Sequence, residues 1–182
     1  IENDAITRSC SGLPLSPGKE ISNKTVGVIG LGAIGQRTAK LAQAFGCKVI
    51  AWNRTPKEIE GVTIVDKKTL FKESDIITLH ISLNDDTRNF ITAKEIALMK
   101  QTSIIVNAAR GPIINSQDLA TALKDGKIAG AALDVYDNEP PLDSNNPMLD
   151  APNTILLPHI GFATKEAFEL RLGIVVRNVE NF

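Results

Sequence analysis

From residue 24 to the end of the chain, short apolar stretches alternate with segments whose apolar residues recur at the spacing of an α-helix. We expect the short stretches to form strands at 26–31, 48–52, 62–65, 76–81, 103–107, 130–135 and 154–157. The segments between them predict helices at 33–45, around 70–71, at 92–99, at 115–124 and from about 164 onward. This alternation is typical of βαβ units, so the chain is predicted to be an α/β protein with a doubly wound parallel sheet.

Two further features concern where the domain begins and where its first helix ends. Residues 1–23 carry several glycines and prolines in a polar setting, which predicts a linker leading into a single domain at 24–182. The first predicted helix has apolar side chains at Ile34, Leu41 and Phe45, and it stops at Gly46, a residue type that favours helix ends.

The sequence G-L-G-A-I-G begins at residue 30, directly after the first predicted strand, and opens the first predicted helix. In this G-x-G-x-x-G pattern Gly30 permits a tight turn, Gly32 lets the backbone approach a pyrophosphate, and Gly35 allows the helix to pack close to the strand. Backbone N–H groups near Ala33 and Ile34, at the positive end of the helix dipole, attract a phosphate group. The strand, turn and helix therefore predict a dinucleotide-binding site.

Composition narrows the class of protein. The 182 residues have a formal net charge of −1, and no basic patch is interleaved with aromatic residues, which argues against a nucleic-acid or membrane partner. No apolar run reaches the roughly eighteen residues that span a bilayer, so we expect a cytoplasmic protein. Cys10 and Cys47 lack metal-ligand spacing, so no metal site is predicted; reduced thiols are favoured and a disulfide stays open.

Three side chains suited to acid–base and anion chemistry follow predicted strands: Arg110, Glu139 and His159. Because the carboxyl ends of parallel strands meet at one edge of a sheet, we expect them to gather there. Taken singly, each fits an ordinary role as a surface ion-pair partner, a solvated carboxylate or a structural histidine. Together they supply an imidazole that titrates near neutrality, a carboxylate that can fix its tautomer and a guanidinium fork suited to an acid or keto group. Reduction of a 2-keto acid needs these parts, and a dinucleotide supplies the hydride.

Several motifs, in this order, resemble the cofactor-binding domain of the D-isomer-specific 2-hydroxyacid dehydrogenase family. They are V-G-V-I-G-L-G-A-I-G-Q from Val26, H-I-S-L from His80, I-V-N-A-A-R-G-P-I-I-N from Ile105, A-A-L-D-V-Y-D-N-E-P-P from Ala131 and L-P-H-I-G from Leu157. The resemblance runs from about residue 16 to 182 and includes glyoxylate and hydroxypyruvate reductases and phosphoglycerate dehydrogenases. It implies a Rossmann-type domain of an NAD(P)-dependent oxidoreductase acting on a small 2-hydroxy or 2-keto acid, and a homodimer.

The resemblance also implies roles for individual residues. Arg110 would hold the substrate carboxylate and carbonyl oxygen, and His159 would exchange a proton with that oxygen while hydrogen-bonded to Glu139. Asp134 would contact the nicotinamide carboxamide, and the backbone at 33–34 would meet the pyrophosphate. Further cofactor contacts would come from His80, Ser82, Thr87, Ala108 and Gly161.

The end of the second predicted strand departs from the NAD-binding members of this family, which carry an aspartate there for the ribose hydroxyls. Here Asn53 lacks the charge that would repel a 2′-phosphate, and Arg54 could pair with that phosphate. The pair favours NADP over NAD. The alternative is that Arg54 points to solvent while Asn53 still binds the plain ribose.

Length is the second departure, because family members have two domains and the substrate domain is absent from these 182 residues. We therefore expect cofactor binding but little turnover from this chain alone, with catalysis in a longer parent enzyme. Two other functions stay open. One is a formate or phosphite dehydrogenase of the same superfamily, although Glu139 argues against formate; the other is a dinucleotide-sensing, corepressor-like module without catalysis.

Overall fold

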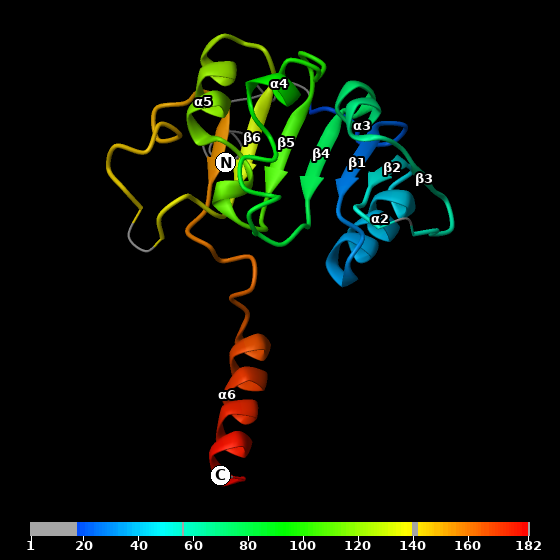
Figure 1. Ribbon diagram of the computed structural model, residues 1–182. Coiled ribbons are helices and arrows are strands. Elements are labelled where there is room, and N and C mark those ends of the chain that lie inside the picture. Colours follow the sequence, from blue (N-terminus) through cyan, green and yellow to red (C-terminus); the bar gives the residue numbers. More distant parts are fainter. Residues whose placement is uncertain (1–17, 56, 140–141, 182) are drawn as a thin grey trace, which may run out of the picture.

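The computed structural model describes residues 18–55, 57–139 and 142–181, and these contain one sheet of seven parallel strands (Figure 1). The strands are β1 (Thr25–Ile29), β2 (Lys48–Trp52), β3 (Val62–Ile64), β4 (Ile76–Leu79), β5 (Ile104–Asn107), β6 (Gly130–Leu133) and β7 (Thr154–Leu156). Their spatial order is β3-β2-β1-β4-β5-β6-β7, with every neighbouring pair parallel. This is the predicted doubly wound sheet, and its chain order reverses between β1 and β4, where such folds bind ligands.

Helices follow β1, β3, β4, β5 and β7, as predicted. They are α2 (Ala33–Ala44), α3 (Lys67–Glu73), α4 (Ala93–Ile96), α5 (Ser116–Lys124) and α6 (Lys165–Glu180), with a short 3₁₀ turn, η1 (Gly111–Ile113). The capping box of Thr92 and Glu95 is present at the start of α4. That helix is shorter than the expected 92–99, because the N–H groups of Leu98 and Met99 bond three residues back instead of four.

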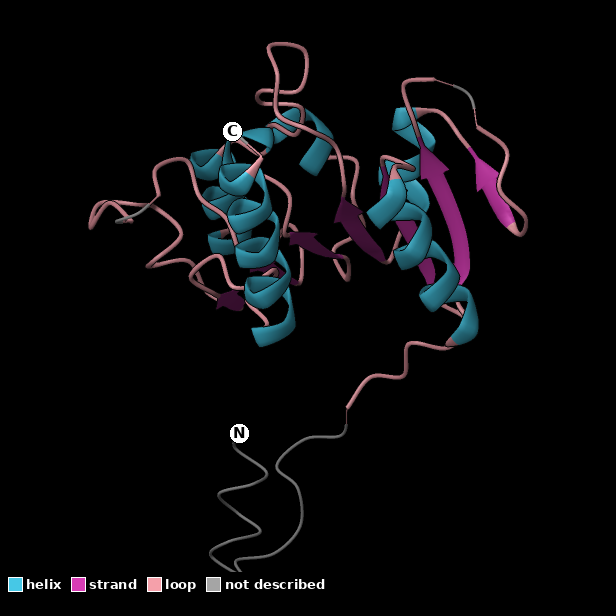
Figure 2. Cartoon of the chain, turned by 90° about the horizontal axis from the view of Figure 1, so that it is seen from below, coloured by secondary structure: helices cyan, strands magenta, loops and turns pink. Residues whose placement is uncertain are grey.

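The two faces of the sheet carry separate apolar cores, and Figure 2 shows helices on both sides of the strands. On one face α3, α4 and α5 bury residues such as Phe71, Ile96 and Leu119. On the other face α2 packs against β1 and β2 through a smaller core that includes Val28 and Val49. Both cores position the strand ends that carry the candidate site.

The buried face of α2 is not the one that its large apolar residues mark. Ile34, Leu41 and Phe45 are 70%, 62% and 64% exposed, whereas the buried positions are Gly35, Ala39 and Ala42. Small side chains let the helix axis approach the strands closely, so they form the packed face. The large side chains are left on the outside.

The predicted final helix is present as α6, which stands away from the sheet and has no buried residue (Figure 1). Its large apolar side chains are all exposed, and their spacing places them on several sides of the helix. They are Phe168, Leu170, Leu172, Ile174, Val175, Val176 and Val179.

Cys47 is buried directly before β2, and its thiol lies 3.3 Å from the carbonyl oxygen of Ile21, to which it donates. Cys10 and the first seventeen residues of the predicted linker lie outside the described part of the chain. Within that part, no helix is long and apolar enough to cross a membrane, and no cluster of side chains has the make-up of a metal site.

Candidate functional site

The glycine turn has the geometry that its sequence predicts. Gly30 adopts a φ of +95°, a left-handed conformation that only glycine takes up readily. A methyl group at Gly35 would lie 1.9 Å from the carbonyl oxygen of Gly30, so the start of α2 packs directly on the turn. A methyl group at Gly32 would meet nothing within 4 Å, which leaves open space on the ligand side of the turn.

The N-terminus of α2 is suited to an anion. Among the described residues no side chain caps this helix, and its first turn contains no acidic residue. The N–H groups near Ala33 and Ile34 therefore point out of the helix without a side-chain acceptor. In contrast, α3, α4, α5 and α6 each begin with a side-chain cap.

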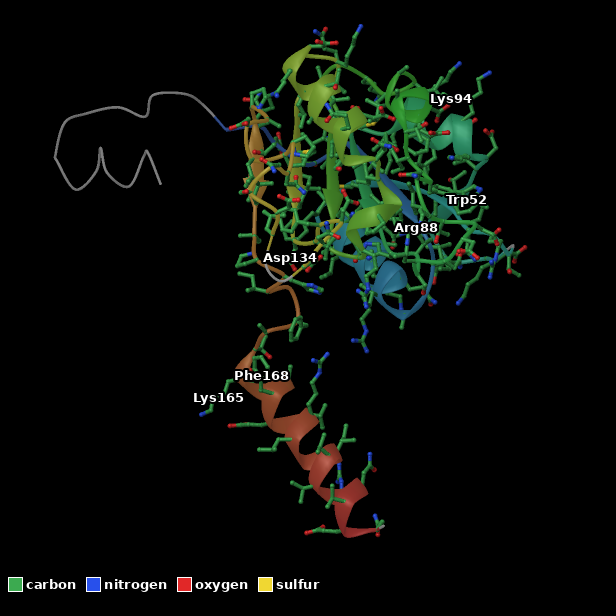
Figure 3. The ribbon with its side chains drawn as sticks, turned by 60° about the vertical axis from the view of Figure 1, so that its left-hand side comes forward. Trp52, Arg88, Lys94, Asp134, Lys165 and Phe168 are labelled. Carbon is green, nitrogen blue, oxygen red and sulfur yellow. The ribbon has the colours of Figure 1, made fainter. Side chains whose placement is uncertain are left out.

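A first cavity of about 260 Å³ lies beside this turn, over the ends of β1, β2 and β4. Several predicted cofactor contacts line it, namely Gly30, Gly32, Asn53, Arg54, His80, Ser82 and Thr87. Trp52 and Phe90 add aromatic surface, with ring centroids 4.9 Å apart. Figure 3 marks Trp52 on this side of the molecule.

Asn53 and Arg54 make specific contacts at the end of β2. The side-chain oxygen of Asn53 accepts a hydrogen bond from the N–H of Leu31 at 2.9 Å, and its amide nitrogen donates to the carbonyl of Thr55 at 2.6 Å. Asn53 therefore ties the glycine turn to the loop after β2. The Arg54 guanidinium is exposed and lies 3.8 Å from the Asp86 carboxylate, which lines the same cavity.

A second cavity of about 560 Å³ continues from the first across the ends of β4, β5 and β6. It is lined by Ile34, His80, Ile81, Ser82, Ala108, Arg110, Asp134, His159 and Gly161, among others. The two cavities share residues 80–82, and the start of α2 borders both. Two joined cavities flanking an anion-binding helix start fit the two nucleoside halves of a dinucleotide.

His80 lies between the cavities, at the end of β4. Its Nε2 is 3.0 Å from the hydroxyl oxygen of Thr78, and its backbone N–H donates to the carbonyl of Ile29. Burial lowers the pKa of the imidazole below the ordinary value of 6.5. At pH 7 the imidazole that lines both cavities is therefore neutral.

The predicted catalytic side chains come from three segments at this edge, 107–111, 134–139 and 157–161, which we call the strand-end loops. Nδ1 of His159 is 2.5 Å from Oε2 of Glu139, and Oε1 of Glu139 accepts a hydrogen bond from the Tyr136 N–H at 2.6 Å. His159 itself has a φ of +55°. The Glu139 carboxylate accepts a hydrogen bond from Nδ1–H of His159, which leaves Nε2 for other chemistry.

Asp134 holds the loop that carries His159, a contact that sequence reasoning did not predict. Its two carboxylate oxygens accept hydrogen bonds from the N–H groups of Ile160 and Gly161, at 2.8 and 2.7 Å. A methyl group at Gly161 would lie 2.9 Å from the same carboxylate, so the absence of a side chain permits the contact. Figure 3 places Asp134 at the end of the sheet from which the chain leads to α6.

Arg110 projects from a loop that a buried asparagine organises. The side chain of Asn107 accepts a hydrogen bond from the Ala109 N–H and donates to the carbonyl of Arg110, at 3.0 and 2.9 Å. The Arg110 guanidinium donates to the carbonyl of Ala109 and is otherwise exposed toward the second cavity. At Gly111 a methyl group would lie 2.0 Å from the backbone of Tyr136, which brings two strand-end loops into contact.

Tyr136 joins these loops and was also missed from the sequence. Its hydroxyl donates to the carbonyl of Leu157 at 3.0 Å, two residues before His159. Burial, followed by the carboxylates of Asp134 and Glu139, raises the pKa of that hydroxyl. A tyrosine between a strand and a polar loop gave no sequence signal, because the carbonyl of Leu157 lies 21 positions away.

The fold and these cavities define a dinucleotide-binding α/β domain. The chain belongs to the D-isomer-specific 2-hydroxyacid dehydrogenase family, whose NAD-binding domain model matches residues 8–161. Its sequence is 43% identical over 164 residues to a glycerate dehydrogenase of Methylorubrum extorquens, covering 90% of this chain and 51% of that protein. It is 47% identical over 168 residues to a D-3-phosphoglycerate dehydrogenase of Methanocaldococcus jannaschii, covering 90% and 32%.

Solved structures agree with this assignment. A glyoxylate reductase from Paecilomyes thermophila superposes with a TM-score of 0.85 at 37% identity, over 99% of this chain and 55% of that one. An acyclic imino acid reductase in complex with NADPH and D-Arg gives the same TM-score and identity, over 98% and 57%. The chain thus spans about a third to a half of the length of the two curated relatives named above.

Proposed function

We propose that this chain is the cofactor-binding part of an NAD(P)-dependent oxidoreductase that transfers a hydride between nicotinamide and a small 2-hydroxy or 2-keto acid. The observation that carries the proposal is the His159–Glu139 pair, at 2.5 Å, whose imidazole lines the same cavity as Arg110 and Ile34 at the start of α2. An acid–base group (His159), an anion-binding group (Arg110) and the cofactor-binding start of α2 thus lie at one cavity. Family membership supports the same reaction class.

Each of the three side chains has a distinct chemical task. The guanidinium of Arg110 binds the substrate carboxylate and orients the carbonyl group. Nδ1–H of His159 donates to Glu139, so the ring keeps one tautomer and presents Nε2 to the substrate oxygen. A bound nicotinamide supplies the hydride in reduction and accepts it in oxidation. In reduction the doubly protonated imidazolium gives its Nε2 proton to the carbonyl oxygen and becomes the neutral Nδ1–H form, and in oxidation that neutral form takes the hydroxyl proton at Nε2.

The cofactor contacts follow from the two joined cavities. The nicotinamide half would occupy the cavity lined by Ala108, Asp134 and Gly161, and the adenosine half the cavity at the end of β2. The pyrophosphate would lie on the N–H groups at the start of α2. His80 and Ser82 border both cavities and would contact the middle of the dinucleotide.

NADP is the preferred cofactor in this proposal. The end of β2 presents no carboxylate of its own, and Arg54 is exposed at the rim of the adenosine cavity. Its contact with Asp86 is long and solvent-exposed, so it is worth at most about 1 kcal/mol and a phosphate can displace it. A 2′-phosphate gains charge-assisted hydrogen bonds to the guanidinium.

Calorimetric titration with NADPH and with NADH tests the cofactor assignment. We expect NADPH to bind about tenfold tighter, and Arg54→Ala to remove that difference while leaving NADH unchanged. Arg88→Ala, at another exposed position, is the matched control. Equal affinities in the unaltered chain would disprove the NADP preference, and binding of neither nucleotide would disprove the dinucleotide site.

Turnover tests the reaction itself. The substrate would lie between this domain and a substrate domain, so the chain alone should reduce glyoxylate, hydroxypyruvate and pyruvate slowly, and a longer polypeptide with both domains rapidly. In that polypeptide His159→Gln should lower the rate by about 10²–10⁴-fold. Cofactor-dependent binding of a protein partner without turnover would favour the corepressor-like alternative.

The proposal includes a homodimer. Leu41 and Phe45 on the outer face of α2 leave large apolar surface exposed, which supports an association of two copies. Sedimentation velocity should give a dimer for the unaltered chain. The double substitution Leu41→Gln and Phe45→Gln should give a monomer that still binds NADPH, whereas an unaltered chain that sediments as a monomer would contradict the proposal.

A further inference from the structure

A second arginine reaches the cavity that contains Arg110, from a different element of the fold. Arg171, in the first half of α6, lines the cavity of about 560 Å³. Its guanidinium carbon lies 4.7 Å from the ring centroid of Phe162. That ring packs edge to face against His159 and Phe168, at centroid distances of 5.6 and 5.9 Å.

Phe162 therefore holds Arg171 beside the proposed catalytic histidine. A guanidinium over an aromatic face is attracted by the ring, and the stack limits the directions in which the side chain can point. Phe168, labelled in Figure 3 near the start of α6, supports the same ring from the helix side.

The charges around this cavity leave both guanidinium groups available. Among the described residues, no carboxylate lies within 4 Å of Arg110 or Arg171. The acidic residues of the strand-end loops are engaged elsewhere: Asp134 accepts two backbone N–H groups, Glu139 accepts from His159 and from a backbone N–H, and Asp137 accepts from the Ser116 hydroxyl. Two like charges facing one cavity repel each other until anionic groups lie between or beside them.

We propose that Arg171 binds a second anionic group of the substrate, a carboxylate or a phosphate, while Arg110 binds the carboxylate next to the carbonyl. The inference rests on the proposed function and names its substrate class: a 2-keto or 2-hydroxy acid that is a dianion. The cofactor pyrophosphate is the competing source of the same chemistry, because Ile34 at the start of α2 lines this cavity too.

Paired ligands distinguish these cases in the chain saturated with NADP⁺, which cannot reduce a keto acid. 2-Oxoglutarate and 2-oxopentanoate have the same carbon chain, but only the first ends in a carboxylate. Their dissociation constants are measured from NMR shift changes. We expect the dianion to bind about tenfold tighter, and Arg171→Gln to remove that difference, because one charge-assisted contact is lost. Arg177→Gln, farther along the same exposed helix, is the matched control and should change nothing.

The other possible results contradict either the role of Arg171 or the proposed substrate site. Equal binding of the two acids, or a preference that survives Arg171→Gln, overturns the inference. So does weaker NADP⁺ binding by Arg171→Gln with an unchanged ratio of the two acids, since Arg171 then serves the cofactor. If Arg110→Gln leaves both affinities unaltered, or neither acid binds, the proposed substrate site itself is wrong.

Discussion

The glycine turn and the strand-end loops lie at the same edge of the sheet but are held in different ways. The shape of the turn is set mainly by its own residues: Gly30 has a φ of +95°, and Gly35 packs on the carbonyl of Gly30, with one hydrogen bond from the Leu31 N–H to the more distant Asn53. The strand-end loops depend on partners far away in the sequence. His159 bonds to a residue 20 positions earlier, and the N–H groups of Ile160 and Gly161 bond to Asp134, 26 and 27 positions away.

The glycine turn is therefore specified mainly by residues that are neighbours in the sequence, whereas the strand-end loops are specified by residues from several separate segments. A strand, a turn and a helix that follow one another form most of the cofactor cradle. A short motif in the sequence is therefore enough to predict it. The proposed catalytic groups need β5, β6 and β7 in register before they meet, and single polar groups such as Asp134 then hold them. Substitutions in the two regions should therefore fail differently, the first by steric conflict and the second by loosening one loop.

The largest effect is expected at the turn. Gly35→Ala places a methyl group 1.9 Å from the Gly30 carbonyl oxygen, so it should cost about 1–3 kcal/mol of stability and abolish measurable NADPH binding. Urea unfolding and calorimetry measure both. Gly32→Ala is the matched variant, because its methyl meets open space: it should fold normally and lose affinity only. A fully stable Gly35→Ala chain that binds NADPH would contradict the account of the turn.

The next effect is expected at the loop that carries His159. Asp134→Ala leaves the N–H groups of Ile160 and Gly161 without their acceptor, at a cost of about 1–3 kcal/mol. Amide hydrogen exchange should show protection lost at these two positions, while the amides of β1 and α2 keep theirs. Unchanged protection at 160–161 would show that the loop is held by other contacts.

A pH effect is expected at His80, which lies between the two regions. Its pKa is lowered by burial, so between that pKa and 6.5 the unfolded chain binds more protons than the folded chain. Stability is therefore fully present above the unfolded value and falls as the pH is lowered from about 7 to about 5.5. Urea unfolding at these two pH values should show a smaller loss for His80→Asn. The same loss in both chains would assign the effect to other groups.

The smallest effect is expected at the rim of the adenosine cavity. Asp86→Asn removes the carboxylate that lies 3.8 Å from Arg54 and competes with a 2′-phosphate. Because the pair is exposed, we expect NADPH affinity to rise by about twofold to fivefold, with NADH unchanged. Asp85→Asn, one residue earlier and also exposed, is the control. A fall in NADPH affinity would mean that Asp86 helps to bind the cofactor.

By itself the sequence determined the order of strands and helices, the parallel sheet, the glycine turn and the positions of Arg110, Glu139 and His159 at strand ends. These features depend on local periodicity and on the rule that parallel strands end at a common edge. Helix ends were predicted less accurately: α4 is shorter than expected because the N–H groups of Leu98 and Met99 bond three residues back.

Tertiary structure alone decided which contacts hold the site and which face of α2 is buried. Asn107, Asp134 and Tyr136 act through backbone groups of loops that only the folded sheet brings near, so no spacing in the sequence reveals them. Likewise α2 buries Ala39 and Ala42 instead of its larger apolar residues, because the close approach of helix and strands favours small side chains. Periodicity identifies a helix, but the distance between packed elements selects the buried face.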